Sequence, residues 1–479
     1  MMKKLVMIAL ALMAIVSTDA LAQTKKAKVD GKSPYMIETK VPVRDKGQKD
    51  MLQFAAPAMP NIRVAMIGLG MRGPGAVGSM IHIPGVEVVA LCDVVEKNVK
   101  KVNAMLEKNN KPKALEFFGD TSIWRKVTKL PNVDLVIIST DWGSHAKIGV
   151  QAMNDGKHVA IEVPAAMNLA EIWDLVNTSE KTRKHCMQLE NCVYDFFELT
   201  TLNMAQKGLF GEILYAEGAY IHNLEPFWKD YWNDWRLQYN IKNYGDLYPT
   251  HGLGPVCQAL NMHRGDKMNY LVAMQTKTVS IPEFIKRTQG RDVSADFRNG
   301  DHTITLIKTE KGKAINIQHN VATPRPYDRM YQLTGTKGFA NKYPEEGYAL
   351  DGKILAGANS VKNHEDFSAH SFLPTAIKDS LMALYRNPIV DDKLIATAKE
   401  VGGHGGMDFI MIYRLIYCLQ NGLPLDMDVY DLAEWCAPIE LTKISLENNS
   451  AAVAVPDFTR GAWNKVNGLT FAIASDEAK

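Results

Sequence analysis

The sequence lacks the charge imbalance that marks proteins binding nucleic acid or anionic membranes. Its 55 lysines and arginines are nearly matched by 53 aspartates and glutamates, which leaves a formal net charge of +2 at pH 7. Binding to a polyanion depends on a basic excess, so we expect no nucleic-acid partner. The composition also excludes collagen-like, coiled-coil and transmembrane-bundle proteins, and there is no internal repeat and no low-complexity tract.

Cysteine is scarce as well. The six cysteines include no C-x-x-C pair and no cluster with histidines at zinc-finger spacing. Most lie inside apolar runs, where a free thiol behaves as a small buried hydrophobic group. We therefore expect no metal site, while pairing between distant cysteines stays open. The six are Cys92, Cys186, Cys192, Cys257, Cys418 and Cys436.

The apolar run at the N-terminus is too short to span a membrane. Leu5–Val16 is an uninterrupted run of 12 apolar residues, whereas a span needs about 20. Lys3 and Lys4 precede it, and Ala20-Leu21-Ala22 follows with the small-x-small pattern of a signal-peptidase site. Residues 1–22 are predicted to be a cleaved secretory signal, with an uncleaved anchor as the alternative. The mature protein is expected to be exported to the periplasm, without a membrane span.

After a polar, lysine-rich arm at residues 23–60, the sequence alternates between short apolar runs and segments of helical periodicity. Such alternation is typical of an α/β domain with a doubly wound parallel sheet of the Rossmann type, here predicted over residues 61–190. The predicted strands are Arg63–Gly68, Val86–Cys92, Val133–Ser139 and His158–Glu162, and the predicted helices include Glu96–Lys108 and Leu169–Lys181.

The alternation stops after about residue 195. His302–Thr309, Ala314–His319 and Tyr331–Gly335 are β-branched segments whose two faces differ, which is typical of antiparallel strands. Residues 191–479 are therefore predicted to form an α+β domain with a mostly antiparallel sheet. Near the end of the chain, Phe409–Leu419 is a strongly apolar helix that we expect to pack back near the first domain.

A glycine-rich loop follows the first predicted strand. Gly68-Leu69-Gly70-Met71-Arg72-Gly73 has the G-x-G-x-x-G pattern that lets the backbone approach a pyrophosphate at a helix N-terminus. Asp93, about 20–25 residues further on at the end of the next strand, is placed to accept hydrogen bonds from an adenosine ribose. The acidic residue favours NAD over NADP. Arg72 fits a contact with the pyrophosphate or with a 2′-phosphate.

The loop Thr140–His145 follows the third predicted strand, at the sheet edge where open α/β sheets bind ligands. Trp142 is suited to cover the adenine or the nicotinamide of a dinucleotide. His145 is suited to reach a phosphate or to cap the following helix. An ordinary surface loop is the alternative.

Aromatic residues are concentrated in residues 215–248, which contain ten of the 40 in the chain. Aromatic faces pack against the C–H faces of sugars, and tyrosine hydroxyls add hydrogen bonds, so the cluster favours a sugar-binding site. A packed core or an oligomer interface is the alternative. The ten, which are interleaved with His222 and Arg236, are Tyr215, Tyr220, Phe227, Trp228, Tyr231, Trp232, Trp235, Tyr239, Tyr244 and Tyr248.

The segment Tyr248-Pro249-Thr250-His251-Gly252 predicts a helix start. Thr250 resembles an N-cap, and His251 would then project from the first turn, where the positive end of the helix lowers the pKa of an imidazole. A histidine there is available as a general acid or base. A capping or structural histidine is the alternative.

Five segments in the same order resemble glycoside hydrolase family 109, whose characterised members are NAD-dependent α-N-acetylgalactosaminidases, within the glucose–fructose oxidoreductase/inositol dehydrogenase superfamily. The resemblance covers most of the mature chain. The segments are Glu162–Ala166, Met187–Asn191, Gly218–His222, Leu247–Gly254 and Gly402–Asp408.

The resemblance implies a role for each matching position. NAD would be held by Met71, Arg72, Asp93, Trp142, Gly143, Ser144, His145, Glu162, Val163 and Asn191. The sugar would be held by Tyr220, Arg236, Tyr248, Pro249, Thr250, His251 and Tyr327. Sugar dehydrogenases of the superfamily carry a Glu-Lys-Pro motif whose lysine helps deprotonate the hydroxyl, but this chain has Glu162-Val163-Pro164. Another group must then move the proton, and the chemically suitable side chains are Tyr194, Tyr220, Tyr248 and His251.

The expected function is cleavage of terminal α-N-acetylgalactosamine or a related α-glycoside. The route available with NAD is oxidation at carbon 3, loss of the carbon-2 proton, elimination of the aglycone, addition of water and re-reduction. A net NAD-dependent sugar oxidoreductase is the first alternative, and a non-catalytic sugar-binding protein with a vestigial NAD fold is the second. The resemblance also implies a homodimer or homotetramer.

Overall fold

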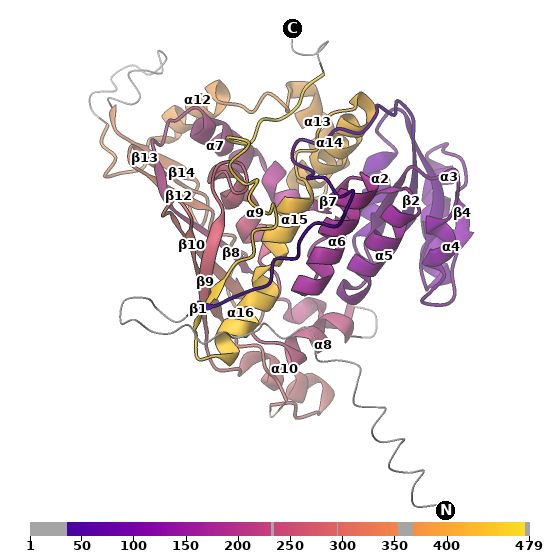
Figure 1. Cartoon of the computed structure of the whole chain (residues 1–479), viewed down its shortest axis with the longest axis horizontal. Helices are drawn as coiled ribbons and strands as arrows, with labels where there is room; N and C mark the ends of the chain where they lie inside the picture. The colour runs from indigo at the N-terminus through magenta and orange to yellow at the C-terminus, as the bar shows by residue number, and fades with distance from the viewer. Residues whose placement is uncertain (1–35, 231–233, 295, 353–366, 475–479) are drawn as a thin grey trace, which may run out of the picture.

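The computed structural model describes residues 36–230, 234–294, 296–352 and 367–474 and contains two sheets (Figure 1). The sheets lie on opposite sides of the molecule, and the C-terminal helices α15 (Val429–Cys436) and α16 (Pro438–Glu447) run between them. The predicted export signal, the start of the arm, Tyr231 and Trp232 lie outside the described residues. In the described part, no helix has the length and apolar character needed to cross a membrane.

The first sheet is the predicted parallel one, and its six strands have the order β4-β3-β2-β5-β6-β7. Its central strands are buried on both faces, because helices cover each side. The order reverses between β2 and β5, which opens a crevice at the carboxyl edge. The strands are β2 Ile62–Ile67, β3 Val86–Cys92, β4 Leu115–Phe117, β5 Leu135–Ile138, β6 His158–Glu162 and β7 Cys186–Leu189. The helices are α2 Gly73–Met80, α3 Glu96–Lys108, α4 Trp124–Thr128, α5 Trp142–Asn154 and α6 Leu169–Thr182.

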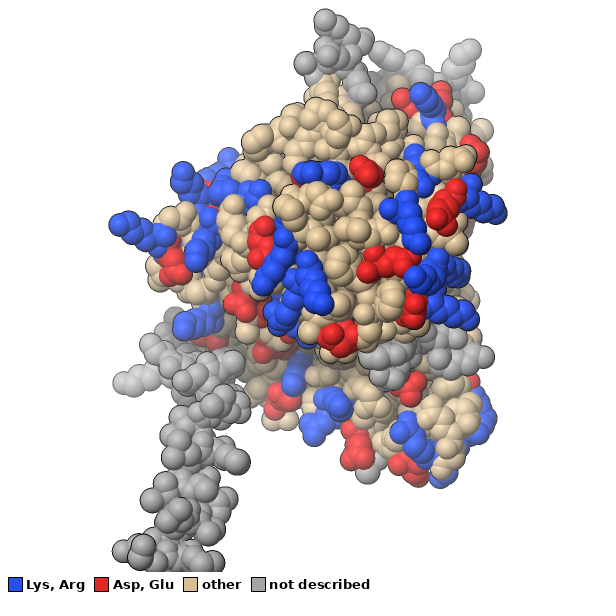
Figure 2. Space-filling model, turned by 90° about the vertical axis from the view of Figure 1, so that its right-hand side faces the viewer, with Lys and Arg blue, Asp and Glu red and all other residues tan. Residues whose placement is uncertain are grey.

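Basic and acidic side chains are intermixed over the outer face of this half (Figure 2). This distribution agrees with the near-zero net charge of the sequence.

The second sheet has nine strands in the order β1-β15-β9-β10-β11-β8-β12-β13-β14. Within the described part of this sheet only β1–β15 and β11–β8 pair in parallel, so the prediction of a mostly antiparallel sheet is confirmed. The strands are β1 Met36–Ile37, β8 Ile213–Ile221, β9 Met268–Gln275, β10 Thr303–Thr309, β11 Ala314–Asn320, β12 Gln332–Gly335, β13 Gly338–Asn341, β14 Gly347–Leu350 and β15 Ala452–Ala454.

The remaining helices cover the second sheet and return to the first. Helix α14 lies against α2, and α15 lies against α6 and β7. All six cysteines are buried free thiols. The helices are η1 Asn191–Tyr194, α7 Phe196–Gln206, η2 Glu225–Asp230, α8 Trp235–Lys242, α9 Thr250–Ala259, α10 Ser280–Gln289, α12 Thr375–Leu384, α13 Asp392–Val401, η5 His404–Gly406 and α14 Met407–Asn421.

The described part of the N-terminal arm belongs to the fold, although it has no core of its own. It supplies β1 to the edge of the large sheet, and the Arg44 guanidinium pairs with the buried Glu180 carboxylate of α6 at 3.0 Å. Arg460 pairs with the same carboxylate at 2.8 Å, and the Tyr430 hydroxyl donates to it. One buried carboxylate therefore ties together the two ends of the described chain.

A second buried ion network joins the end of α9 to α15. The Nδ1 atom of His263 lies 2.9 Å from the Glu434 carboxylate, and Arg264 forms two hydrogen bonds with Asp431. Burial and the Arg264 charge lower the pKa of His263, but Asp431, Asp428 and Glu434 outweigh them and raise it to about 10. The imidazolium therefore belongs to the folded state.

This network predicts a pH-dependent stability. Because the folded pKa of His263 lies above its unfolded value of about 6.5, its contribution is complete below that pH and is lost as the pH rises toward 10. His263→Gln should lower the free energy of unfolding at pH 6 by about 3 kcal/mol and flatten its fall between pH 7 and 10. Urea unfolding at several pH values measures both effects. The exposed His82→Gln is the control, and an unchanged pH slope in His263→Gln would contradict the assignment.

Candidate active site

A cavity of about 980 Å³ opens at the carboxyl edge of the parallel sheet. It begins at the glycine-rich loop and Asp93, passes Trp142 and Glu162, and ends at Arg236 and Tyr248 of the second domain. Its size and its position at the strand-order reversal are those of a ligand site in an open α/β sheet.

The glycine-rich loop has the close packing that a dinucleotide site requires. Gly68 has a φ of +93°, and a Cβ atom there would overlap the carbonyl group of Ser139. A Cβ atom at Gly73 would overlap the Gly68 carbonyl, whereas one at Gly70 would meet open space. The first and last glycines thus fold the turn, and the middle one leaves the backbone open to a pyrophosphate.

Asp93 lies where the sequence analysis expects it, at the end of β3 and facing the cavity. One carboxylate oxygen accepts a hydrogen bond from the Leu69 amide at 2.6 Å, and the other accepts from the Val95 amide at 2.7 Å. The carboxylate is therefore held rigidly beside the glycine-rich loop.

Trp142 begins α5 and forms a wall of the cavity. Its ring centroid lies 5.0 Å from that of Trp235 and 5.9 Å from that of Tyr248, and the Arg236 guanidinium lies 4.9 Å from it. The hydroxyl of the next cavity residue, Ser144, donates to Asp141 in the same turn. A Cβ atom at Gly143 would come within 2.9 Å of the Tyr239 hydroxyl, so this turn packs closely against the second domain.

His145 lines the cavity from within α5, whose N-cap is Asp141, and its ring is held by backbone oxygens. Its Nδ1 lies 2.9 Å from the Pro164 carbonyl oxygen and its Nε2 lies 3.0 Å from the Thr140 carbonyl oxygen. Burial lowers the pKa of the ring. Both nitrogens face backbone oxygens, so the ring braces the loop after β6 rather than reaching a phosphate or capping the helix.

Two residues that the family resemblance assigns to NAD, Arg72 and Asn191, meet at the carboxylate of Asp408, and Arg72 also pairs with a third, Glu162. Arg72 pairs with Glu162 at 3.1 Å and with Asp408 at 3.0 Å. The Asn191 side-chain amide donates to the other Asp408 oxygen at 2.6 Å. The Glu162 carboxylate also accepts from the Val163 amide. The guanidinium of Arg72 thus faces two carboxylates, and Asp408 is a site residue that the sequence analysis places only within a matched segment.

Several residues that the family resemblance assigns to the sugar lie where α9 crosses β8. A Cβ atom at Gly218 or at Gly252 would overlap the backbone of the other element, so the absence of side chains lets them touch. This approach places the His251 ring 5.4 Å from Tyr220 and 4.9 Å from Tyr248, and the two tyrosine rings lie 4.4 Å apart.

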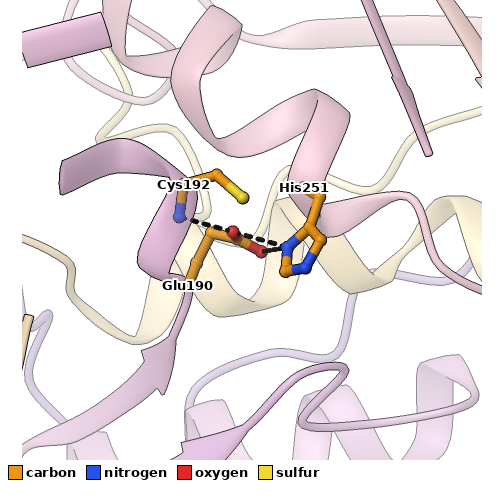
Figure 3. Close-up of side chains that lie close together, drawn as sticks. All are labelled: Glu190, Cys192 and His251. Carbon is orange, nitrogen blue, oxygen red and sulfur yellow. Dashed lines mark hydrogen bonds and ion pairs between the residues drawn. The ribbon is translucent and has the colours of Figure 1, made fainter. Parts of the chain in front are cut away.

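His251 is held by a carboxylate that the sequence analysis missed. Its Nδ1 atom lies 2.7 and 2.9 Å from the two oxygens of Glu190, which also accepts from the Cys192 amide at 3.0 Å (Figure 3). Burial alone raises the pKa of Glu190, but the pairing with His251 and these hydrogen bonds hold it below its usual value. The available signal was its position directly after a buried strand, at the ligand-binding edge of the sheet.

Two groups of side chains in the described part offer metal-ligating atoms within 4.8 Å of one another, although the sequence predicts no metal site. In the first, burial raises the pKa of the Cys192 thiol well above its usual value, and His251 already partners Glu190. In the second, Arg264 and His263 already supply positive charge to the carboxylates. The groups are Glu190, Cys192 and His251, and His263, Asp428 and Asp431.

Two further expectations need correction. The buried Tyr194 hydroxyl donates to Asp426 at 3.1 Å, within the Arg414–Asp426 ion pair, and burial raises its pKa well above the usual value. It is therefore a structural residue instead of a catalytic one. Thr250 is the first residue of α9, and Pro249 holds the N-cap position without a side-chain hydrogen bond.

Tyr327 and His222 lie at the outer end of the aromatic group. Tyr327 is 39% exposed, and its ring centroid lies 5.0 Å from that of His222. The Tyr220 hydroxyl lies 3.0 Å from Nδ1 of His222. A row of aromatic rings therefore leads from the surface inward to His251.

The two halves of the chain match two protein-family models. Residues 62–189 match the model described as oxidoreductase family, NAD-binding Rossmann fold. Residues 194–465 match the model described as glycosyl hydrolase 109, C-terminal domain.

Solved structures with a similar fold include an NAD-binding oxidoreductase from Klebsiella pneumoniae, with a TM-score of 0.62, 18% identity and coverage of 83% of this chain and 100% of that one. A levoglucosan dehydrogenase in complex with NADH has a TM-score of 0.59, 18% identity and coverage of 83% and 99%. Both similarities support the fold.

Relatives with much higher identity are also found. A glycosyl hydrolase family 109 protein of Bacteroides fragilis is 59% identical over 98% of both chains. A protein of the same name from Bacteroides thetaiotaomicron is 58% identical over 99% of this chain and 100% of its own. The chain therefore belongs to glycosyl hydrolase family 109, and its cofactor is NAD, bound by the Rossmann domain.

Proposed function

We propose that the protein is an exported glycosidase that removes terminal α-N-acetylgalactosamine, or a related α-linked sugar, by transient oxidation at carbon 3, elimination, addition of water and re-reduction. The observation that carries the proposal is the His251–Glu190 pair beside Tyr220 and Tyr248, next to a dinucleotide cavity. Ordinary glycosidases use two carboxylates that flank the bond, and NAD-dependent ones are an exception.

The cofactor would lie along the cavity from Asp93, past the glycine-rich loop, to Trp142 and Val163. When bound, NAD supplies reversible removal of a hydride from a ring carbon. The cavity continues to Tyr248 and Arg236, so a sugar bound among the aromatic rings would adjoin the cofactor.

The Glu190 carboxylate sets the protonation pattern of His251. Its lowered pKa keeps it ionised at neutral pH, so it accepts a hydrogen from Nδ1. A neutral imidazole that donates through Nδ1 has a free lone pair on Nε2, which points away from Glu190 (Figure 3). His251 is thus a general base at Nε2, and it returns the proton as a general acid.

The two tyrosines complement this base. Burial raises the pKa of Tyr248 well above its usual value, so its hydroxyl stays protonated and can donate to a developing negative charge on the sugar. Tyr220 is hydrogen-bonded to His222 and lies in ring contact with Tyr248. These groups take over the proton handling that a lysine at position 163 performs in the dehydrogenases.

Export and self-association are also part of the proposal. Residues 1–22 have the pattern of a cleaved signal, and a redox-neutral cycle suits a compartment without soluble NAD. On the outer face of the large sheet, Met274, Ile304 and Leu306 are exposed and lie on adjacent paired strands. We expect this face to pair with a second copy, and a monomeric mass in solution would contradict that expectation.

The test of the function is a release assay with purified protein and a chromogenic α-N-acetylgalactosaminide. The proposal expects repeated turnover without added NAD and without net accumulation of NADH. Stoichiometric NADH from free sugar would instead support the oxidoreductase alternative. Tight sugar binding with no turnover on any aryl glycoside would support the sugar-binding alternative.

Asp93→Ala should weaken the retention of NAD, because the variant loses two ribose hydrogen bonds worth roughly 1–2 kcal/mol each. The measurement is the NAD content of the purified protein after extensive dialysis. Glu87→Ala, an exposed position at the opposite end of the same strand, is the matched control. Equal NAD content in the wild type and Asp93→Ala would remove Asp93 from the cofactor site.

His251→Ala should lower turnover by about 10²–10⁴-fold while NAD stays bound, which is the usual scale for a general acid–base group. The exposed His370→Ala is the control, and circular dichroism checks folding. Tyr248→Phe should also lower turnover, because it removes the hydroxyl donor. Near-normal turnover in both variants would exclude this segment from the chemistry.

A further inference from the structure

We propose that Asp408 is a positioning residue that clamps NAD in its site, so that the cofactor is retained between turnovers. The proposal rests on the placement of NAD at the carboxyl edge of the parallel sheet, as argued above. Asp408 comes from the second half of the chain, 336 residues from Arg72, and nothing in its local sequence marks it as part of a cofactor site.

The two oxygens of Asp408 bind residues that follow different strands of the parallel sheet. One oxygen accepts from Arg72 at 3.0 Å, and Arg72 in turn pairs with Glu162 at the end of β6. The other oxygen accepts from Asn191, just beyond the end of β7, at 2.6 Å. The Asp408 side chain therefore fixes Arg72 and Asn191 on the rim where a dinucleotide would lie, and through Arg72 it is linked to Glu162.

The surroundings of Asp408 show that its position is specific. A Cβ atom at Gly403, which has a φ of +78°, would come within 2.8 Å of the carboxylate. Burial alone raises the pKa of Asp408, but His404 and Arg72 outweigh it and lower the pKa, so the group is a carboxylate at neutral pH. Gly403 and His404 therefore pack against the carboxylate on the side away from Asn191, and the same oxygen that contacts His404 faces Arg72.

The clamp, which consists of Asp408 and its contacts with Arg72 and Asn191, joins helices that pack against one another. Asp408 lies in the first turn of α14, which packs against both α2 and η1. Arg72 directly precedes α2, and Asn191 begins η1. Movement of the glycine-rich loop away from a bound dinucleotide would have to break the Arg72–Asp408 ion pair and its links to these elements. This dependence predicts slow release of the cofactor.

The experiment measures the release of NAD directly. Protein loaded with radiolabelled NAD is mixed with an excess of unlabelled NAD, and the label that remains bound is followed by gel filtration. Asp408→Asn keeps the shape but removes the charge opposite Arg72, and release should become about 10-fold faster or more. Gly403→Ala should also accelerate release, because it displaces the carboxylate.

The matched control is Asp134→Asn, which breaks an Arg–Asp pair of similar geometry with Arg63 at the opposite end of the same sheet. Its release rate should stay within about twofold of the wild type. Saturating NAD should return the turnover of Asp408→Asn toward the wild-type value, a recovery that a misfolded active site would not show.

Unchanged release in folded Asp408→Asn and Gly403→Ala would overturn the proposal, as would equal acceleration in Asp134→Asn. If Asp408→Asn does not fold, Gly403→Ala decides the question. The retention of NAD is measured without a glycoside, so the two proposals can fail separately. If Asp408 slows the release of NAD but the protein cleaves no glycoside, the glycosidase function is refuted and the role of Asp408 is still supported.

Discussion

The buried carboxylate of Glu190 is the constraint around which the two halves of the molecule are joined. Its side chain has no exposed surface, and an ionised carboxylate in such a position is tolerated only when other groups pair with it and donate hydrogen bonds to it. His251 supplies such a donor from α9, while Glu190 itself follows β7 of the parallel sheet. Satisfying this one group therefore fixes the substrate domain against the cofactor domain.

Helix α9 is closely packed on both sides of the His251–Glu190 pair. On one side, the glycine contacts between α9 and β8 place Tyr220 beside His251. On the other, the turn after α9 carries His263 and Arg264 into the carboxylates of α15, and α15 lies against β7. The helix that carries the proposed base is thus held at both of its ends, which suits a group that must keep its geometry through several proton transfers.

Local sequence patterns were sufficient to predict much of the fold. The predicted segments Val86–Cys92, Glu96–Lys108 and His158–Glu162 have the bounds of β3, α3 and β6, because continuous burial and helical periodicity are recorded in neighbouring residues. The glycine-rich loop and Asp93 were found for the same reason. Contacts between residues far apart in the sequence leave no such local pattern. Glu190 meets His251 across 61 positions and Arg72 meets Asp408 across 336, and residue type alone could not show that Tyr194 and His145 are committed to buried partners.

The central proposal is that the sugar is oxidised and reduced again on one protein, with the His251–Glu190 pair handling protons. Hydrolysis of an α-N-acetylgalactosaminide in deuterium oxide, followed by mass spectrometry of the released sugar, tests it most directly. The account predicts one deuterium at carbon 2 in the wild-type product and much slower formation of that labelled product in Glu190→Gln, in which His251 loses its charged partner. Release of sugar without deuterium at carbon 2 would contradict it.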